Sequence, residues 1–535
     1  LCSKLYPCLE IDATIQYALA ERKEVLSNAD KGVISPYNTY TNAGLPAGPI
    51  ANPGMNSIRA ALYPAETNYY FYALNADGTT SPRPITSTRT SWRSSRARPS
   101  RTRSRRTRPR TAKRPPIRRI RQMDRRKPEL LSPAGDMEKL RMAVAYGADA
   151  VYLGTTAFSL RNLADNFTLE QVAEAVRYAH ERCVKVYVTV NAFMRDEDLE
   201  NLPETIAALD AAGADALIIN DPSVIRIAKR VAPSLPLHLS TQANTLNSEA
   251  ALFWHEQGIE RIVLARELTL SQIAQMRRKL PETLELEAFV HGAMCVSYSG
   301  RCLFSNYIDG RDSNRGECVQ PCRWSYEIRE RGNDGEYFTV VADRKGSFIL
   351  NSRDMCMAEH LNEVIDSGII SLKIEGRMKS ILYVATVVNA YRMALDGCDM
   401  ELVMNELNRI SHRPYTTGFM LDNDAMGSKA PLMAPESGGY IQDYAIAAVV
   451  LDYDSERKIA HVEQRNRFFD GDELHILAPK DVARAFRVNG IRSEEGEMQQ
   501  SAPHPCQKLY IGCSEPVAPG SILRVAAKKN PVFSA

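Results

Sequence analysis

The chain has 535 residues, of which 44% are hydrophobic and 24% charged, so it is long enough for two to four domains with packed cores. No apolar run approaches the ~18 residues of a transmembrane helix, and the N-terminal residues LCSKLYPCLEID do not resemble a signal peptide. The eleven cysteines, an odd number, do not indicate a secreted disulfide framework and favour a reducing cytoplasm.

The N-terminal part, residues 1–85, is predicted to be a fragment of an α+β domain. A helical run (IDATIQYALAERKEVL) leads into a Pro/Gly-rich segment, a short helix (MNSIRAALYPA) and a strand (NYYFYAL). Residues 11–77 resemble the C-terminal end of endolytic murein transglycosylases, through the runs IDAT, SPYNTY, GLP and PIANPG. The catalytic glutamate and membrane anchor of that family lie upstream of this part, so the resemblance implies no lytic activity of its own.

The next tract concentrates the positive charge. Residues 83–127 carry 19 Lys and Arg against one acidic residue, which leaves 48 basic and 63 acidic residues elsewhere. Residues 86–127 are predicted to be a disordered Arg-rich linker because they cannot bury a core. Three interpretations of 86–122 are open: a nucleic-acid-binding arm, a solvated linker, and a junction made by a shifted reading frame. In the third interpretation, Met123 is the first residue of a run, MDRRKPELLSPAGD, that is typical of the beginning of a protein.

From residue 128 onward, apolar strand candidates alternate with amphipathic helical runs. This alternation predicts an α/β fold, a (β/α)8 TIM-like barrel over 128–400. The long interval 293–370 would form an enlarged loop at the catalytic face. The strand candidates are 129–135, 148–154, 184–192, 214–221, 235–242, 261–265, 284–292 and 371–376.

The C-terminal part begins with a predicted helical link over 401–438. The short alternating runs YAIAAVVLDYD, KIAHVEQRN, DELHILAPK and SILRVAAK then predict a small all-β domain over 439–535, a barrel or a sandwich. Such a domain could bind a macromolecular partner, a partner protein included, or serve as a structural cap.

Four cysteines crowd into the loop after the seventh predicted strand, with the spacing C-x6-C-x15-C-x3-C. They are Cys295, Cys302, Cys318 and Cys322. Thiolates grouped this tightly usually hold a metal or an iron–sulfur cluster. Zinc sites show paired C-x2-4-C hooks, which only the second pair approaches. Iron–sulfur is the leading interpretation, with a zinc knuckle and unbound thiols as alternatives.

These cysteines lie within a longer pattern. The run EAFVHGAMC from Glu287 to Cys295, followed by GRCLFS from Gly300 to Ser305, resembles the signature of peptidase family U32, the collagenase-like proteins. Phe304 departs slightly from the aliphatic residue expected there. The resemblance extends from about 128 to 530 and includes LSPAG (131–135), NA (191–192), STQ (240–242) and KIEGRMKS (373–380).

The resemblance implies two accounts of function. One is collagenase-like proteolysis, although no H-E-x-x-H or G-x-S-x-G motif is present and the base nearest a cysteine nucleophile would be His291. The other follows from the branch with this cysteine pattern, the SLKIEGRMKS segment and a C-terminal β domain, which resembles the tRNA uridine hydroxylation proteins. It implies a cytoplasmic [4Fe-4S] enzyme that makes wobble 5-hydroxyuridine in tRNA, with prephenate as co-substrate. Peptidoglycan lysis is a third alternative, judged inactive.

The cluster ligands are predicted to be the four grouped cysteines, and Cys356 competes with Cys322 for the fourth position because some relatives supply that ligand from a distance. Further candidates fall at or near strand ends. Arg377 and Lys379 could clamp a phosphate or carboxylate. Alternatively, Lys373 and Glu375 form an ion pair inside the barrel. The catalytic candidates are His291, Glu375 and Arg377, and the substrate-binding candidates are Asn191, Gln242, Lys373 and Lys379.

Overall fold

The computed structural model divides the chain into two compact units, Leu1–Ile117 and Arg118–Ala535. In the first unit, the strand predicted in NYYFYAL is confirmed as β1 (Tyr69–Leu74), which pairs antiparallel with β2 (Thr80–Pro84). The two predicted helices of this unit and the Arg-rich tract 86–122 lie outside the described residues. The structure describes residues 27, 30–35, 38–42, 69–74, 80–84, 127–160, 166–324, 329–331, 337–339, 351–421 and 440–527.

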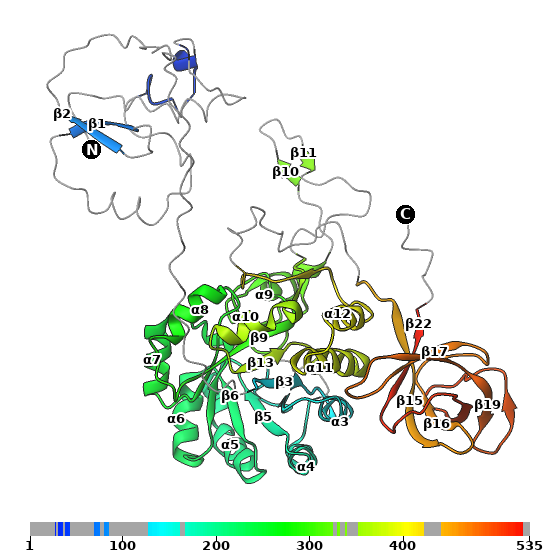
Figure 1. Cartoon of the computed structure of the whole chain (residues 1–535). Coiled ribbons are helices and arrows are strands. Elements are labelled where there is room, and N and C mark those ends of the chain that lie inside the picture. Colours follow the sequence, from blue (N-terminus) through cyan, green and yellow to red (C-terminus); the bar gives the residue numbers. More distant parts are fainter. Residues whose placement is uncertain are drawn as a thin grey trace, which may run out of the picture. The chain divides into compact units, whose positions relative to one another are not determined.

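The second unit contains a closed barrel of parallel strands (Figure 1). All eight predicted strands are present, and β13 closes the ring because it pairs with both β9 and β3. The predicted (β/α)8 barrel is therefore confirmed. The strands are β3 (Glu129–Pro133), β4 (Ala150–Gly154), β5 (Lys185–Val190), β6 (Ala216–Ile219), β7 (Leu237–Leu239), β8 (Arg261–Val263), β9 (Glu285–Ala293) and β13 (Ser371–Ile374).

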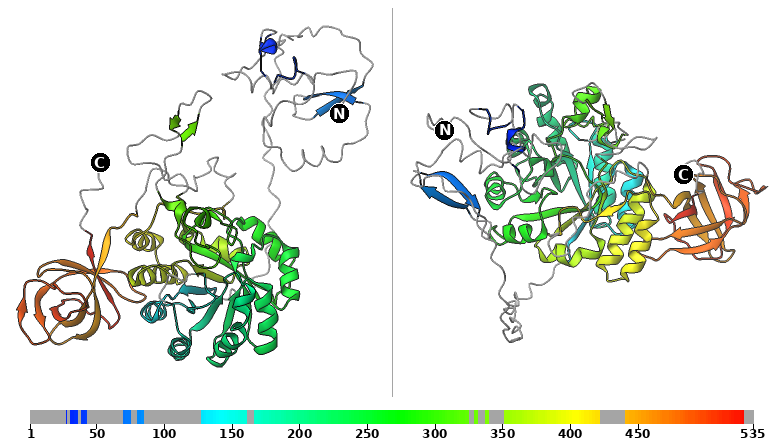
Figure 2. Two further views of the ribbon diagram at one scale, coloured as in Figure 1. Left: turned by 180° about the vertical axis from the view of Figure 1, so that it is seen from behind. Right: turned by 90° about the horizontal axis from the view of Figure 1, so that it is seen from above.

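Most residues of the strands are apolar on both faces because each face is covered. Inward-pointing side chains such as Tyr152, Tyr187 and Ile218 form a cluster inside the barrel. Outward-pointing side chains pack against helices that surround the strands (Figure 2). These helices are α3 (Met137–Ala145), α4 (Leu169–His180), α5 (Leu202–Ala211), α6 (Pro222–Val231), α7 (Ser248–Glu256), α8 (Leu270–Arg277), α10 (Leu361–Asp366) and α11 (Ile381–Leu395).

The segment between β9 and β13 leaves the barrel at the C-terminal end of β9. Its strand β12 (Asp354–Cys356) runs antiparallel to the end of β9 and also pairs with β14 (Tyr415–Thr416). These pairings bring residues near 350 and near 415 to the same barrel mouth. The segment also contains α9 (Phe304–Asp309), η4 (Pro321–Arg323), β10 (Arg329–Arg331), β11 (Tyr337–Thr339) and η5 (Ala358–His360).

The predicted all-β domain is an eight-stranded antiparallel sheet in the order β18-β17-β22-β15-β16-β21-β19-β20. Four of its strands correspond to the predicted runs, and four further ones were not predicted. The predicted strands are β15 (Tyr444–Asp454), β16 (Ile459–Gln464), β17 (Glu473–Leu477) and β22 (Ile522–Ala526). The additional strands are β18 (Arg484–Arg487), β19 (Asn489–Ser493), β20 (Met498–Gln499) and β21 (Lys508–Gly512).

This domain packs on the barrel through α11 and α12 (Met400–Asn408). Helix α11 is buried from Ile381 to Met393 on all its faces, because the barrel covers one side and the β domain the other. The amide of Asn389 donates to the carbonyl of Asp481 at 3.0 Å. A fully buried ion pair joins Arg524 to Glu406 of α12 at 2.6 Å. Among the described residues, no helix is long and apolar enough to cross a membrane.

Candidate active site at the barrel mouth

The C-terminal end of the barrel gathers most of the predicted site residues. Asn191 directly follows β5, Gln242 lies in η3 (Thr241–Ala243) after β7, and Glu375, Arg377 and Lys379 follow β13. The four grouped cysteines lie in the loop that follows β9. Chain segments distant in sequence therefore meet where enzymes of this architecture carry their chemistry.

Polar contacts hold the cysteine loop against the mouth. The amide of Asn244, which has a left-handed backbone (φ +52°), donates to the carbonyl of Ser299 at 2.6 Å. Further along, the side chains of Ser313 and Asn314 both donate to the carbonyl of Cys302, at 2.5 and 3.1 Å. The loop is thus tied both to the segment after β7 and to itself around one of the cysteines.

A salt bridge ties the same loop to the segment after β5. Arg315 contacts both carboxylate oxygens of Asp198, at 2.6 and 3.1 Å, and donates to the carbonyl of Phe193 at 2.8 Å. This guanidinium lowers the pKa of Asp198, so the carboxylate stays ionised and the anchor persists at neutral pH. Bidentate pairing of this kind fixes orientation as well as position.

The four thiols are free, and three of them act electrostatically on the fourth, Cys322. Cys295 is exposed, and Cys302, Cys318 and Cys322 are half-buried. The pKa of Cys322 is raised to about 11, mainly by burial; Arg323 opposes the shift and the other three cysteines add to it. Their charges act on Cys322 only because all four lie in the same neighbourhood.

Cys356 has different surroundings. It is buried at the end of β12, opposite His291 of β9. Burial raises the pKa of its thiol to about 11, while a backbone hydrogen bond and the hydroxyl of Tyr391 oppose the shift. The cysteines that influence Cys322 are not among the groups that influence Cys356. This placement favours Cys322 over Cys356 as the fourth predicted ligand.

Across the described residues, no three His, Cys, Asp or Glu side chains are arranged around a common point as ligands of a single metal ion. The donor set nevertheless has the chemistry of a thiolate-bound cluster. It consists of four reduced cysteines on one anchored loop, none of them in a disulfide. Binding of iron to these sulfurs would lower the pKa of Cys322, which burial now raises.

His291 lies beneath the loop in a cage of tyrosines. It is 1% exposed, and its ring centroid lies 5.3 Å from that of Tyr391, 5.5 Å from Tyr415 and 6.1 Å from Tyr383. Nδ1 is 3.3 Å from the hydroxyl of Tyr391, while Nε2 is buried with no hydrogen-bond partner among the described residues. Burial lowers the pKa of His291 to about 3, so the imidazole is neutral at physiological pH.

The residues after α12 also contribute to the mouth, although the sequence indicated only a helical link there. Arg413 donates to the carboxylate of Asp354 at 2.7 and 3.0 Å and to the side chain of Asn351 at 3.1 Å, and all three residues are buried. His412 stacks on Tyr415 at 4.2 Å. The polar and aromatic run HRPYTT was the available signal that this link belongs to the site.

Arg377 is buried at the end of the barrel rather than exposed as a rim clamp. It donates to the hydroxyls of Thr189 and Ser159 at 2.9 and 2.8 Å. Two glycines leave room for it: a Cβ on Gly154 would collide with the guanidinium, and one on Gly135 would collide with its backbone carbonyl. The position of Arg377 is therefore fixed by its hydrogen bonds and by the space that the two glycines leave.

The other polar candidates make longer contacts around the same rim. The carboxylate of half-buried Glu375 is 3.5 Å from the hydroxyl of Tyr152. The amide of Asn191 and the backbone N–H of Gln242 both lie 3.4 Å from the hydroxyl of Ser240. Their catalytic and substrate-binding roles stay predictions.

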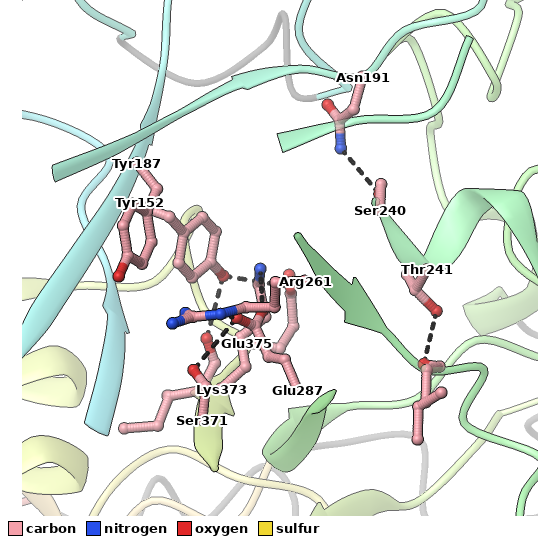
Figure 3. A network of polar contacts seen from close by, with 12 residues as sticks. Tyr152, Tyr187, Asn191, Ser240, Thr241, Arg261, Glu287, Ser371, Lys373 and Glu375 are labelled. Atoms are coloured by element: carbon pink, nitrogen blue, oxygen red, sulfur yellow. Dashed lines mark hydrogen bonds and ion pairs between the residues drawn. The ribbon is translucent and has the colours of Figure 1, made fainter. Parts of the chain in front are cut away.

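Lys373 lies deeper, in a network of charges inside the barrel (Figure 3). Its ammonium is 2.8 Å from Glu287, and both side chains are almost fully buried. Arg261 contacts Glu287 at 3.3 Å and Glu129 at 2.6 Å. Burial alone would raise the pKa of Glu287, but the positive charges of Lys373 and Arg261 outweigh burial, so the pKa is lowered overall. The interior ion pair considered for Lys373 therefore exists, with Glu287 rather than Glu375 as its partner.

Comparison with known proteins identifies the class. The chain belongs to peptidase family U32, whose family model matches residues 135–429, and the model of the U32 C-terminal domain matches residues 442–524. The predicted U32 resemblance is thus confirmed. Residues 3–83 match the YceG-like family, which covers the segment of the predicted N-terminal resemblance.

Individual relatives carry two kinds of name. The chain is 38% identical over 408 residues to tRNA hydroxylation protein P1 of Bacillus subtilis, covering 75% of this chain and 95% of the relative. It is 34% identical over 427 residues to tRNA hydroxylation protein P of Escherichia coli, covering 70% and 92%. It is also 28% identical over 415 residues to a collagenase of Porphyromonas gingivalis, covering 74% and 97%.

Proposed function

We propose that this U32 protein is an iron–sulfur enzyme that hydroxylates the wobble uridine of tRNA, with prephenate as co-substrate. The observation that carries the proposal is the anchored loop of four free thiols at the mouth of the barrel, three of which act electrostatically on the fourth, Cys322. The similarity to two tRNA hydroxylation proteins supports the choice of substrate. A tRNA substrate also agrees with the expected cytoplasmic location.

Cys295, Cys302, Cys318 and Cys322 would hold the [4Fe-4S] cluster. When bound, the cluster would supply a redox centre whose potential depends on burial and on hydrogen bonds around the sulfurs. The chain's own residues set those conditions. Three of the four thiols are half-buried, and the guanidinium of Arg323 acts directly on Cys322.

The surface around the cysteine loop suits an unpaired nucleotide. Tyr307 is 80% exposed on α9, and Trp324 and Tyr298 are also exposed on this loop. Aromatic side chains of this kind stack on single-stranded bases without selecting among them. A wobble uridine lies in a single-stranded loop, so it could be turned out toward the mouth at low cost.

The alternative, a collagenase-like peptidase, receives less support from the geometry. A cysteine nucleophile needs a nearby base to take its proton. Cys295 is exposed, whereas His291 is buried in the tyrosine cage with a pKa of about 3, which makes it a poor base at neutral pH. The names of two relatives, a collagenase and an uncharacterized protease, support this candidate.

The first test compares Cys322→Ser with Cys356→Ser in full-length protein purified without oxygen. Wild type and Cys356→Ser should show broad absorbance near ~400 nm with stoichiometric iron and sulfide, and Cys322→Ser should lose most of it. A colourless wild-type protein that contains zinc, or that hydrolyses gelatin without iron, would refute the cluster. If Cys356→Ser loses iron and Cys322→Ser retains it, the fourth ligand is Cys356 and not Cys322.

The second test addresses the substrate in a deletion strain. Wild-type protein should restore 5-hydroxyuridine in tRNA, and Cys295→Ser should not. A chain that starts at Met123 serves as a control, because it retains both parts that match the U32 family. If 5-hydroxyuridine levels are unchanged by the deletion, the assignment to tRNA is wrong.

A further inference from the structure

Three cationic side chains converge on one tyrosine ring at the edge of the cysteine loop. The ring of Tyr440 lies 4.2 Å from the ammonium of Lys379 and 5.4 Å from the guanidinium of Arg413, and its hydroxyl is 3.5 Å from Nη1 of Arg323. Arg323 ends η4, Lys379 lies in the segment after β13, Arg413 precedes β14, and Tyr440 lies in the segment before β15. Tyr440 is 46% exposed, so the group can be reached from solvent.

The carboxylate next to this group, that of Asp354, is already bonded to Arg413. Asp354 accepts from Nε, Nη2 and the backbone N–H of Arg413 with its two carboxylate oxygens. Within the described part of the chain, neither Arg323 nor Lys379 lies within ion-pair distance of a carboxylate, and Nε of Arg323 is buried without a hydrogen-bond partner. The ammonium of Lys379 lies over the rings of Tyr383 and Tyr440, at 5.2 and 4.2 Å from their centroids.

Such an arrangement is costly unless an anion completes it. Arginine keeps its charge in proteins, and a partly buried charge without an opposite partner is unfavourable. A second guanidinium nearby adds repulsion. The geometry points to an anion site at Arg323, Lys379 and Tyr440, which takes a carboxylate or phosphate group beside Cys322.

The chemistry of the ligand follows from the donors. The guanidinium of Arg323 offers planar paired N–H groups, the fork that matches the oxygens of a carboxylate or phosphate, while Lys379 adds a point charge and Tyr440 a hydroxyl donor. Two sources have this chemistry: a small carboxylic acid and a backbone phosphate of RNA. The existence of the site is independent of the proposed function, but the choice between these sources rests on it.

Calorimetric titration of the full chain, purified without oxygen, tests the site with succinate, inorganic phosphate and a short single-stranded RNA. At least one of these probes should bind. Arg323→Gln and Lys379→Gln should each weaken that binding about tenfold or more, since each removes charge-assisted hydrogen bonds. Arg323→Lys, which keeps the charge, should lose less. Arg311→Gln is the matched control, because Arg311 lies on the same loop but is exposed and paired with Asp309 at 3.1 Å.

The pattern of losses identifies the source. If the Arg323→Gln and Lys379→Gln variants bind succinate more weakly but bind RNA as wild type does, the natural ligand is a small carboxylic acid. If they bind RNA more weakly, and inorganic phosphate competes with RNA for the wild-type protein, the ligand is a phosphate of RNA. The site is refuted if no probe binds, or if binding survives in both Arg323→Gln and Lys379→Gln. It is also refuted if Arg323→Gln loses iron but keeps anion binding, because Arg323 then serves the cysteines alone. Hydroxylation of tRNA is scored separately, so its failure leaves the binding result intact.

Discussion

Charged side chains are paired inside the barrel but only partly paired at its mouth. In the interior network of Figure 3, Glu287 contacts Lys373 and Arg261, and Arg261 also contacts Glu129, so each of these charges faces an opposite one. At the mouth, Arg323 and Lys379 have no carboxylate within ion-pair distance among the described residues, and the nearby carboxylate of Asp354 is occupied by Arg413. The same residue types are thus paired within the barrel and in excess at its mouth.

This difference separates charges that hold the fold together from charges that can act on a ligand. A buried pair that is complete contributes little net stability, but removal of one partner leaves an uncompensated charge and is strongly destabilising. A group that is incomplete in the protein alone can be completed by a ligand, and its loss should affect binding more than folding. Substitutions in the interior network should therefore reduce stability, whereas substitutions at the mouth should mainly reduce ligand binding.

The largest expected effect is at the interior network. Glu287→Gln leaves Lys373 and Arg261 facing a neutral amide, and we expect the free energy of unfolding to fall by about 3–5 kcal/mol. Urea unfolding followed by circular dichroism measures the change. The control is Arg141→Gln, which removes an exposed pair with Glu174 at 3.3 Å and should cost less than about 1 kcal/mol. Equal effects in the two variants would contradict the structural role of the network.

A smaller effect concerns the buried imidazole beneath the mouth. The pKa of His291 is about 3 in the folded protein, and therefore lies below its unfolded value. Between these values the unfolded state binds more protons, so stability is lost as pH falls through the window from about 6.5 toward 3. At pH 5 the loss should be about 2 kcal/mol.

Unfolding of wild type and His291→Gln at pH 7 and pH 5 tests this expectation. The variant should lose about 2 kcal/mol less than wild type between the two pH values. His504→Gln, at an exposed histidine of the C-terminal domain, is the control and should follow wild type. If His291→Gln retains the full loss of stability at pH 5, the buried imidazole is not its source.

The smallest effect on stability should come from the exposed face of the cysteine loop. Tyr307→Ser should change the free energy of unfolding by less than about 0.5 kcal/mol, because the side chain is 80% exposed. Under the proposed function it should nevertheless weaken tRNA binding about fivefold or more, since base stacking on an aromatic ring is lost. Phe253→Ser, at an exposed aromatic on α7, is the control for filter-binding measurements. Equal tRNA affinity in both variants would remove Tyr307 from the interface.

The fold was largely predictable from local pattern. Each barrel strand is a short apolar run, because parallel strands bury both faces, and such runs are visible in one sequence. The strands that escaped prediction are short and partly exposed, as in β18 (RAFR) and β20 (MQ) of the C-terminal sheet. Their pairing depends on the neighbouring strand rather than on their own composition.

The site was predictable only in part. The cysteines and the polar residues at strand ends could be named, because their spacing and their position after apolar runs are local features. Asp354 and Tyr391 could not, because each belongs to the mouth through contacts across long stretches of chain. The run HRPYTT could have drawn attention to Arg413, but it does not indicate the partner of that residue. The bond from Arg413 to Asp354 spans 59 residues, and that from Tyr391 to His291 spans 100.

The sequence alone determined the alternation of strands and helices, the crowding of four thiols behind β9 and the resemblance to peptidase family U32. Only the tertiary structure decided which charges meet. Lys373 pairs with Glu287, 86 residues away, rather than with Glu375, because closure of the ring places β13 beside β9. Pairing of charges depends on strand register and on closure of the ring, and neither is encoded in the residues beside a charge.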